Sequence, residues 1–379
     1  MPHRRTRLVS PAARALGVLL GLTAICGPSV AADAPPSTAA PQAPTANVTP
    51  TDERAFYQRL QYVSHKRNLT GLNVDDQVLK VLADGAVDVA VATLSAQSAA
   101  GNQNSNIALV RIQHWCNRVL SAQPADSKAQ LDRIAPLISS QRLARAAGVY
   151  VAERAYMEHA RQGCGKAHFD FGAIEARLRT AAESGDPASA TELAQFLRDP
   201  AQHEALLERA AAKNFAPAQY ALATNRLIAV RKGETTENVG SIRLLLKQAG
   251  QTLSRAKVDL ANCMALGCDG HPADAATAAA FGTDAARDGE PLAFVSMVQM
   301  PWGGRLTRVQ ILAWQYYGDK LNELGCTGDA YIPNSVAFAR TLAMLEKGQD
   351  ANLLQQAKAQ LATLWQQNGE RARKQQGCD

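Results

Sequence analysis

One pair of residues in this 379-residue chain has the spacing of a catalytic motif. Ser254 and Lys257 form a Ser-x-x-Lys sequence, the pattern of a serine nucleophile with a lysine partner. Penicillin-recognising enzymes, which use this motif, also carry Ser-Asx-Asn and Lys-Thr-Gly sequences, and this chain has neither. Ala256 lies between the two residues, at a packing position of the repeat described below. We therefore interpret the motif as coincidental.

Cysteine and histidine residues raise two further possibilities, a zinc site and disulfide bonds. Cys263-x4-Cys268-x2-His271 offers three potential ligands and Cys164-x3-His168 two more, but these spacings match no standard zinc module. An even number of cysteines remains once an export signal is removed, and this number favours disulfides in an oxidising compartment. We expect no metal site. The disulfide candidates are Cys116, Cys164, Cys263, Cys268, Cys326 and Cys378.

The other polar residues give no pattern typical of an enzyme. The histidines are dispersed, and the chain has no glycine-rich phosphate loop. Two carboxylate pairs, Glu153 with Glu158 and Asp269 with Asp274, could be imagined in glycan cleavage, but solvated helix faces account for such pairs. We expect no catalytic residue and no cofactor.

Aromatic residues are sparse except around one Pro-Gly segment, residues 300–304. Trp302 lies on this segment and is our candidate for an exposed aromatic on a binding surface, because such rings are favoured at interfaces. Trp314 and Tyr317 follow it. We expect these two side chains to pack inward as the large residues of a helix.

The first 31 residues are predicted to be a cleavable signal peptide. Arg4, Arg5 and Arg7 form a basic start, residues 15–25 are an apolar run too short to span a bilayer, and residues 29–31 match the small-x-small cleavage pattern. An uncleaved anchor is the alternative, but no stop-transfer pattern follows. We expect a periplasmic or secreted protein whose mature chain does not span the membrane.

Removal of the signal changes the charge of the chain. It takes away four of the 40 Lys and Arg residues and no acidic residue, so the net charge falls from +6 to +6 − 4 = +2. A nearly neutral chain with scattered charges lacks the basic footprint of a nucleic-acid-binding protein. We expect no nucleic-acid partner.

The remaining sequence divides into a linker and a helical body. Residues 32–51 are mostly Pro, Ala and Thr and are expected to form a flexible linker. Beyond them, alternating β patterns are scarce, the helix formers Ala, Leu, Arg, Gln and Glu recur, and Gly, Pro and Asp interrupt at short intervals. This pattern predicts an all-α protein of many short helices.

Four segments of the body align without gaps. A turn residue in each is followed four positions later by a small residue, and four positions after that by a large apolar residue. The segments are residues 181–194, 210–223, 248–261 and 285–298, with turn residues Gly185, Asn214, Thr252 and Gly289, small residues Ser189, Ala218, Ala256 and Ala293, and large residues Leu193, Leu222, Leu260 and Met297. Gly325 continues the turn series, at steps of 29, 38, 37 and 36 residues.

This repeat predicts helical hairpins. Each first helix ends just before a left-handed turn residue, and the next helix begins near Pro187, Pro217 or Pro291, because proline suits the first turn of a helix. The small residue and the large one four positions later share a face, so neighbouring helices approach closely at one and fill the seam with the other. One hairpin cannot bury its apolar face alone, so hairpins stack.

The pattern resembles the Sel-one-like repeat, a relative of the tetratricopeptide repeat, which runs small-small-Glu-x-Gly-x-x-x-Ala-x-x-x-Leu-Gly. Residues 181–194 and 285–298 match it best, and the resemblance covers about residues 170–330. It implies a helical-hairpin repeat solenoid, a superhelix. Thr252 replaces the turn glycine and the first step of 29 residues is short, so divergent repeats with irregular curvature are implied. An alanine-rich helical bundle is the alternative.

The position of the repeats also divides the rest of the chain into regions. We expect a helical N-terminal region at residues 52–170, either degenerate repeats or a cap, then repeats at 171–330 and capping helices at 331–379.

Six cysteines allow 15 pairings. Because contacts in a solenoid are local, sequential pairing is expected: Cys116 with Cys164, Cys263 with Cys268, and Cys326 with Cys378.

These features predict a non-catalytic helical-repeat scaffold that binds a protein, a peptide or another component of the bacterial cell envelope. Two alternatives stay open. The first is an envelope enzyme that acts on peptidoglycan or β-lactams, since some cysteine-rich proteins with similar repeats are linked to penicillin binding; their regular cysteine pair in each repeat is missing here. The second is a structural envelope protein without a specific ligand.

Overall fold

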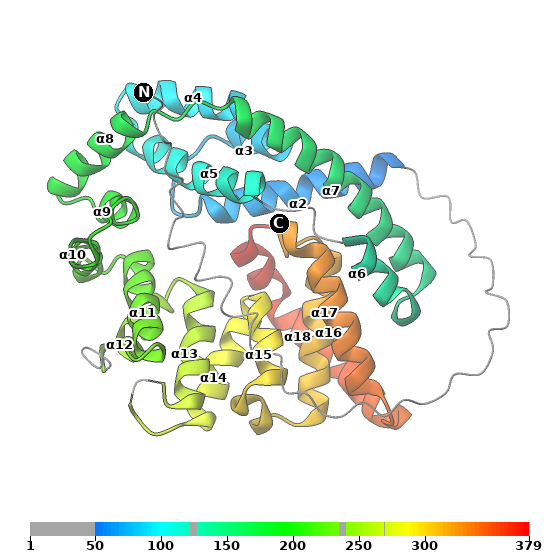
Figure 1. Cartoon of the computed structure of the whole chain (residues 1–379). Coiled ribbons are helices and arrows are strands. Elements are labelled where there is room, and N and C mark those ends of the chain that lie inside the picture. Colours follow the sequence, from blue (N-terminus) through cyan, green and yellow to red (C-terminus); the bar gives the residue numbers. More distant parts are fainter. Residues whose placement is uncertain (1–49, 122–126, 235–239, 269, 379) are drawn as a thin grey trace. The chain divides into compact units, whose positions relative to one another are not determined.

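The computed structural model describes residues 50–121, 127–234, 240–268 and 270–378. Within these ranges the chain forms helices and contains no β-strand, so the expected all-α class is confirmed (Figure 1). The predicted signal peptide, nearly all of the predicted linker and Asp269 lie outside the described residues.

The helices follow one another through short turns and are interrupted by short 3-10 segments, η1 to η3. In chain order the elements are α2 (Pro50–Asn68), α3 (Asp76–Ala83), α4 (Val87–Ala99), α5 (Gln103–Ser121), α6 (Ser127–Ile134), η1 (Ala135–Leu137), α7 (Ser140–Lys166), α8 (Phe171–Glu183), α9 (Pro187–Ala194), α10 (Pro200–Ala212), α11 (Ala216–Arg231), α12 (Ser241–Ala249), α13 (Ser254–Leu266), α14 (Ala275–Arg287), α15 (Pro291–Gln299), η2 (Pro301–Arg305), α16 (Arg308–Glu323), η3 (Gly328–Ala330), α17 (Tyr331–Glu346) and α18 (Ala351–Gln376).

Capping residues and prolines set many helix starts. Asp186 accepts a hydrogen bond from the Ser189 backbone N–H at 2.7 Å, and Pro187 then opens α9. Pro291 opens α15 in the same way, as predicted. Within the described residues the first helix begins at Pro50, inside the range expected for the linker, because this proline suits a first turn and acidic residues follow it.

The turn positions of the repeat have the predicted left-handed backbone at four of the five sites. Gly185, Asn214, Gly289 and Gly325 have φ angles of 97°, 58°, 77° and 82°. Thr252 differs, because a β-branched residue is strained in this conformation. There the backbone N–H of Thr252 donates to the carbonyl of Ala249, the last residue of α12, at 3.2 Å.

The seam positions occupy equivalent places in every hairpin. The four small residues are fully buried at 0% exposure, and the four large residues are at most 3% exposed. They lie at matching positions of α9, α11, α13 and α15, the second helices of successive hairpins. The prediction that small side chains at a fixed step bring helices together is therefore confirmed, as is the expected helical-hairpin repeat solenoid, seen in the hairpins from α8 to α15.

The same turn recurs in the N-terminal region. Gly85 joins α3 to α4 with a φ of 82°, and Ala90 and Leu94 on α4 are almost completely buried. The buried pair lies one residue later than the repeat register would place it, which explains why the sequence signal is weak in this region.

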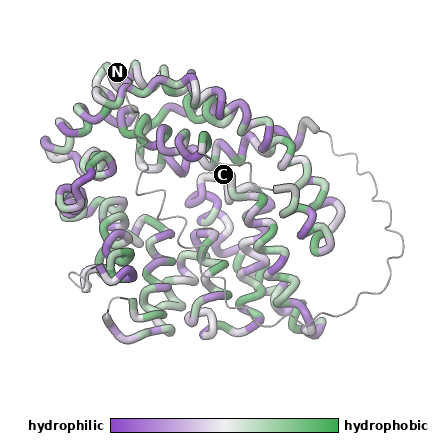
Figure 2. Tube along the Cα trace, viewed as in Figure 1, coloured by the Kyte–Doolittle hydropathy of each residue, from purple (hydrophilic) through white to green (hydrophobic). Residues whose placement is uncertain are grey.

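From α8 to α15 each helix packs mainly against its neighbours along the chain, and α9 with α11 and α13 with α15 also make contact. Outside this range α7 packs against α2 and α5, and α18 packs against α16. One apolar core runs from α2 to α13 and includes part of α17, and a second runs from α13 to α18. A third, smaller core joins α16, α17 and α18. Figure 2 shows hydrophobic and hydrophilic residues alternating along the helices, as expected when each helix buries only part of its surface.

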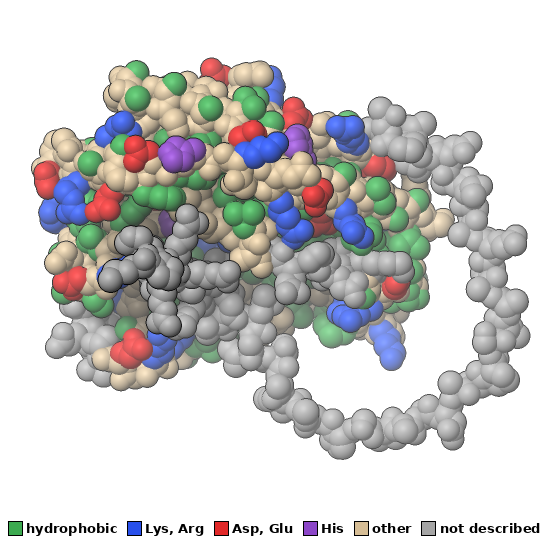
Figure 3. Space-filling model, turned by 45° about the horizontal axis from the view of Figure 1, so that its top comes forward, with side chains coloured by type: hydrophobic (Ala, Val, Ile, Leu, Met, Phe, Trp, Pro, Cys, Tyr) green, Lys and Arg blue, Asp and Glu red, His purple; other side chains and the backbone are tan. Residues whose placement is uncertain are grey.

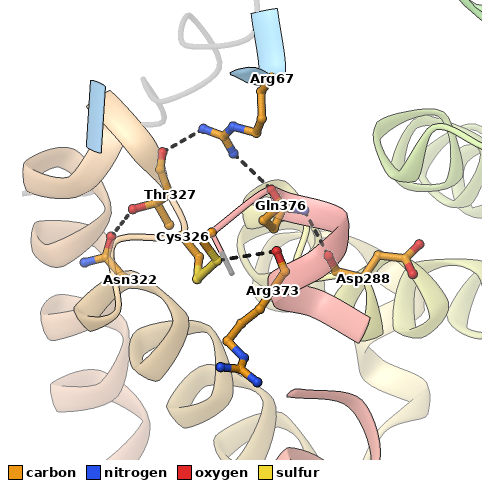
Figure 4. Close-up of a disulfide and its surroundings, with 8 residues drawn as sticks. Arg67, Asp288, Asn322, Cys326, Thr327, Arg373 and Gln376 are labelled. Atoms are coloured by element: carbon orange, nitrogen blue, oxygen red, sulfur yellow. Dashed lines mark hydrogen bonds between the residues drawn. A yellow bond between two sulfur atoms is a disulfide. The ribbon is translucent and has the colours of Figure 1, made fainter. Parts of the chain in front are cut away.

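The last helices of the chain also contact the first. Arg67 of α2 donates to the Gln376 side-chain oxygen at 2.9 Å and to the Thr327 carbonyl at 2.8 Å (Figure 4). Gln376, at the end of α18, in turn donates to the carbonyl of Asp288 at 2.9 Å. Helix α6 packs against α17, and Arg142 of α7 pairs with Asp319 of α16 at 2.7 Å. The contacts of Arg67 and Arg142 join segments that are about 180 to 310 residues apart in the sequence.

Three disulfides connect the six cysteines in the order expected from the sequence. Cys116–Cys164 joins α5 to α7, and Cys263–Cys268 ties the end of α13 to the loop that follows it. Cys326–Cys378 joins the turn after α16 to the end of α18 (Figure 4). The Cα atoms of the pairs lie 4.9 to 5.4 Å apart, within the usual range for a disulfide.

Candidate functional site

A groove of about 630 Å³ lies between the start of α2, the end of α3 and one face of α7. Its α7 wall is built from side chains spaced three or four residues apart, so they share one helix face. These residues are small or apolar, which leaves open space beside α2: Ala144, Gly148, Val151, Ala152 and Ala155. Val151 is 67% exposed, so an apolar surface faces solvent at this site.

Glu53 is the unusual residue of the groove. It lies in the first turn of α2 and is only 7% exposed. Its carboxyl oxygen Oε2 is buried and has no hydrogen-bond partner among the described residues. Burial raises the pKa of Glu53, the charge of Arg145 lowers it, and the nearby Asp52 raises it; the net shift is upward. A buried carboxyl without full hydrogen bonding costs stability, so its presence calls for an explanation.

Gly148 makes room for Glu53. A Cβ atom added to this glycine would lie 2.6 Å from Cγ and 3.0 Å from Cβ of Glu53. Any other residue at position 148 would therefore displace the Glu53 side chain. The close approach of α2 to α7 at this point holds the carboxyl against the wall of the groove.

Two tyrosines line the groove beside Glu53. The rings of Tyr57 and Tyr156 pack edge to face, with centroids 5.6 Å apart. The Tyr156 hydroxyl donates to the Leu82 carbonyl at 3.1 Å and lies 2.9 Å from Nε2 of the buried His65. Since that hydroxyl has one proton, Nε2 of His65 is the donor in the second contact. This network fixes both rings in place.

The rim at the end of α3 is polar. Asp84 accepts a hydrogen bond from the Gln58 amide at 2.9 Å, and its carbonyl lies 2.8 Å from Nδ1 of His159. Arg54 lines the groove on the α2 side. The groove therefore combines an apolar wall, two aromatic rings, a buried carboxyl and a hydrogen-bonded rim.

The Ser-x-x-Lys pair lies elsewhere, in the seam between α13 and α14. Ser254 is buried, and its hydroxyl donates to Oδ2 of Asp288 at 2.8 Å. Lys257 pairs with the same oxygen at 2.7 Å and with Asp284 at 2.6 Å. Arg371 of α18 adds a hydrogen bond to Asp288 at 2.7 Å. Both residues of the motif therefore bridge helices through Asp288, a structural arrangement.

Burial raises the pKa of Asp284, but the hydrogen bonds and charges of Lys257 and Arg371 outweigh this effect and hold the pKa below its usual value. Asp284 therefore stays ionised at neutral pH, and the cluster joins the repeats to the last helix.

The cysteines that were considered as possible zinc ligands form disulfide bonds. Cys263 and Cys268 are bonded to each other, and Cys164 is bonded to Cys116, so none of them offers a free thiolate for a metal.

The expectation that Trp302 is exposed is wrong. The ring is 0% exposed, and its Nε1 donates to the side-chain oxygen of Asn262 at 3.0 Å. Helix α14 accommodates the ring at Gly282, where an added Cβ would lie 2.5 Å from it. The Pro-Gly segment forms η2, which folds back against α13 and α14 and buries the tryptophan. Trp314 and Tyr317 are buried in the core, as predicted.

On the face shown in Figure 3, Lys and Arg side chains are interspersed with Asp and Glu. Among the described helices, none combines the length and apolar character needed to cross a bilayer.

The groove was not predicted from the sequence. The run of small residues on residues 144–155 has helical spacing and could have indicated an open helix face. Nothing in the sequence pairs Glu53 with Gly148, which is 95 residues further along the chain, because helix packing alone brings them together.

Comparisons with known proteins add little to this description of the chain. No family model matches the chain, and no curated protein matches it. One solved structure that resembles it is the crystal structure of c5321, described as a protective antigen present in uropathogenic Escherichia coli strains and displaying an SLR fold. The two are 14% identical, with a TM-score of 0.31, and the alignment covers 85% of this chain and 87% of that chain. The turn and seam geometry of the chain itself thus defines its architecture.

Proposed function

We propose that this protein is a non-catalytic scaffold of the bacterial cell envelope, built from divergent Sel-one-like repeats, that binds an extended segment of a protein partner in the groove between α2 and α7. The groove carries the proposal. It offers an exposed apolar wall, fixed aromatic rings and a buried carboxyl that lacks a full set of partners. Such a combination is typical of a binding site and costs stability if it has no ligand.

The assignment to the Sel-one-like family is supported by the repeat geometry. The turn residues adopt the left-handed conformation at four sites, and the small and large seam residues are buried at equivalent positions in four hairpins. Export to the periplasm or beyond is supported by the three disulfides, because such bonds persist in oxidising compartments.

Site-specific photocrosslinking tests the function. A photoreactive phenylalanine replaces Val151, which is 67% exposed in the groove, or Val89, which is 53% exposed on α4 and does not line it. We expect a crosslinked partner segment from position 151 in intact cells and none from position 89. A synthetic peptide of that segment should bind the purified mature protein.

A groove-filling variant completes the test. Ala155 is exposed and lines the groove, so Ala155→Trp should block binding of the peptide. Ala147 is exposed on the same helix outside the groove, and Ala147→Trp is the matched control that should bind normally. Equal binding by both variants would contradict the proposal. Nitrocefin or cell-wall turnover by the purified protein that is lost in Ser254→Ala would instead favour an enzyme.

A further inference from the structure

The buried carboxyl of Glu53 indicates what the groove selects. An ionised carboxylate can accept about four hydrogen bonds. Here the buried oxygen Oε2 has no partner among the described residues, although the whole residue is only 7% exposed. A cationic group that enters the groove would supply the missing donors and charge, and hydrogen bonds between two charged groups are the strongest kind.

The charged residues around Glu53 do not take the place of such a cationic ligand. Arg145 acts on Glu53 through its charge, but its guanidinium lies 3.6 Å from Glu323 and stacks over the ring of Phe56 at 5.7 Å. Arg54 lines the groove, and Asp52 adds negative charge near the carboxyl. Arg145 is thus already engaged with Glu323 and Phe56.

The walls suit the stem of a long cationic side chain. Lysine and arginine pack their methylene groups on apolar surface while the charged end reaches a polar partner. The α7 wall supplies that surface, and Tyr57 and Tyr156 line the groove beside it. The volume of about 630 Å³ exceeds that of one side chain, so flanking residues of an extended peptide fit as well.

We infer that the groove recognises a lysine or arginine side chain of an extended peptide, with Glu53 as the residue that determines this specificity. This inference rests on the proposed function, since it names the ligand chemistry of the same groove. It requires that the peptide lies along the α7 wall and directs its cationic side chain toward the Glu53 carboxyl.

Defined peptides test the inference. The probes are alanine pentapeptides with acetylated and amidated ends and a central lysine, methionine or glutamate, titrated into the isotopically labelled mature protein and followed by NMR chemical shifts. Methionine is close to lysine in length but carries no charge. We expect the lysine peptide to bind about tenfold more tightly than the methionine peptide, and the glutamate peptide to bind most weakly.

Glu53→Gln keeps the size of the side chain and removes its charge. In this variant the lysine-to-methionine preference should fall from about tenfold to about one. Thermal unfolding followed by circular dichroism confirms that the variant is folded, and the comparison of peptides on the unaltered protein does not depend on the variant.

The outcomes separate the two proposals. Equal binding of the lysine and methionine peptides, with both blocked by Ala155→Trp, would overturn the cation inference and leave the groove as a binding site. Tighter binding of the glutamate peptide would also overturn the inference. Failure of all three peptides to shift any groove resonance, up to millimolar concentrations, would count against both the inference and the proposed function.

Discussion

The Cys326–Cys378 disulfide should contribute more to stability than the Cys263–Cys268 disulfide. The perturbation is the double substitution of each pair by alanine. Residues of the first pair are 52 positions apart and those of the second pair 5 apart. In the chain-entropy description, closing the longer loop restricts the unfolded chain more, and the two bonds are worth about 4 and about 2 kcal/mol.

The comparison is well matched. Cys326 and Cys263 are both buried, and their partners Cys378 and Cys268 are both half-buried, so the loss of packing on substitution largely cancels. The longer bond also holds the end of α18 beside Arg67 of α2, where the first and last helices meet (Figure 4). Its loss should therefore loosen contacts that the shorter bond does not affect.

Urea unfolding followed by circular dichroism measures the difference in unfolding free energy, and amide hydrogen exchange locates it. We expect the Cys326/Cys378 variant to lose about 2 kcal/mol more than the Cys263/Cys268 variant. Its exchange should accelerate first in α18. An equal or smaller loss, with α18 still protected, would refute the reasoning that this bond closes a long loop at a junction of distant helices.

Three further predictions concern single residues. Ala256→Leu, in a fully buried seam position, should cost about 1–3 kcal/mol by overpacking, whereas Ala280→Leu on an exposed face should have little effect on urea unfolding. Asp288→Asn removes the shared carboxylate of the buried cluster and should cost about 2 kcal/mol in the same assay, against at most about 0.5 kcal/mol for Glu175→Gln in an exposed pair; equal losses would contradict the assigned role. Because the folded-state pKa of Glu53 is raised, its ionised form destabilises the fold above that pKa, and the penalty vanishes below the unfolded-state pKa. Glu53→Gln should therefore raise the melting temperature at about pH 8 and change it little at about pH 4, and the opposite trend would disprove the assignment.

The sequence alone predicted the local parts of the fold. A left-handed turn needs glycine or asparagine, a helix start favours proline, and a close helix approach needs a small side chain, so Gly185, Pro187 and Ala218 carry their structural roles in their types and spacing. Sequential disulfide pairing followed from the short range of contacts in a hairpin stack. At Thr252 the repeat pattern was correct while the expected backbone conformation was not, because a β-branched residue changes the turn.

Packing between residues that are far apart in the sequence determined the features that the sequence did not predict. Trp302 looked exposed because proline and glycine surround it, yet η2 folds onto α13 and α14 and buries it. The groove depends on how closely α2 approaches α7 at Glu53 and Gly148, and the meeting of Arg67 with Gln376 spans 309 residues. Such contacts depend on the angles at which many helices cross, and small differences at each seam add up along the chain. Residue types specify each seam, but only the assembled structure shows which distant side chains meet.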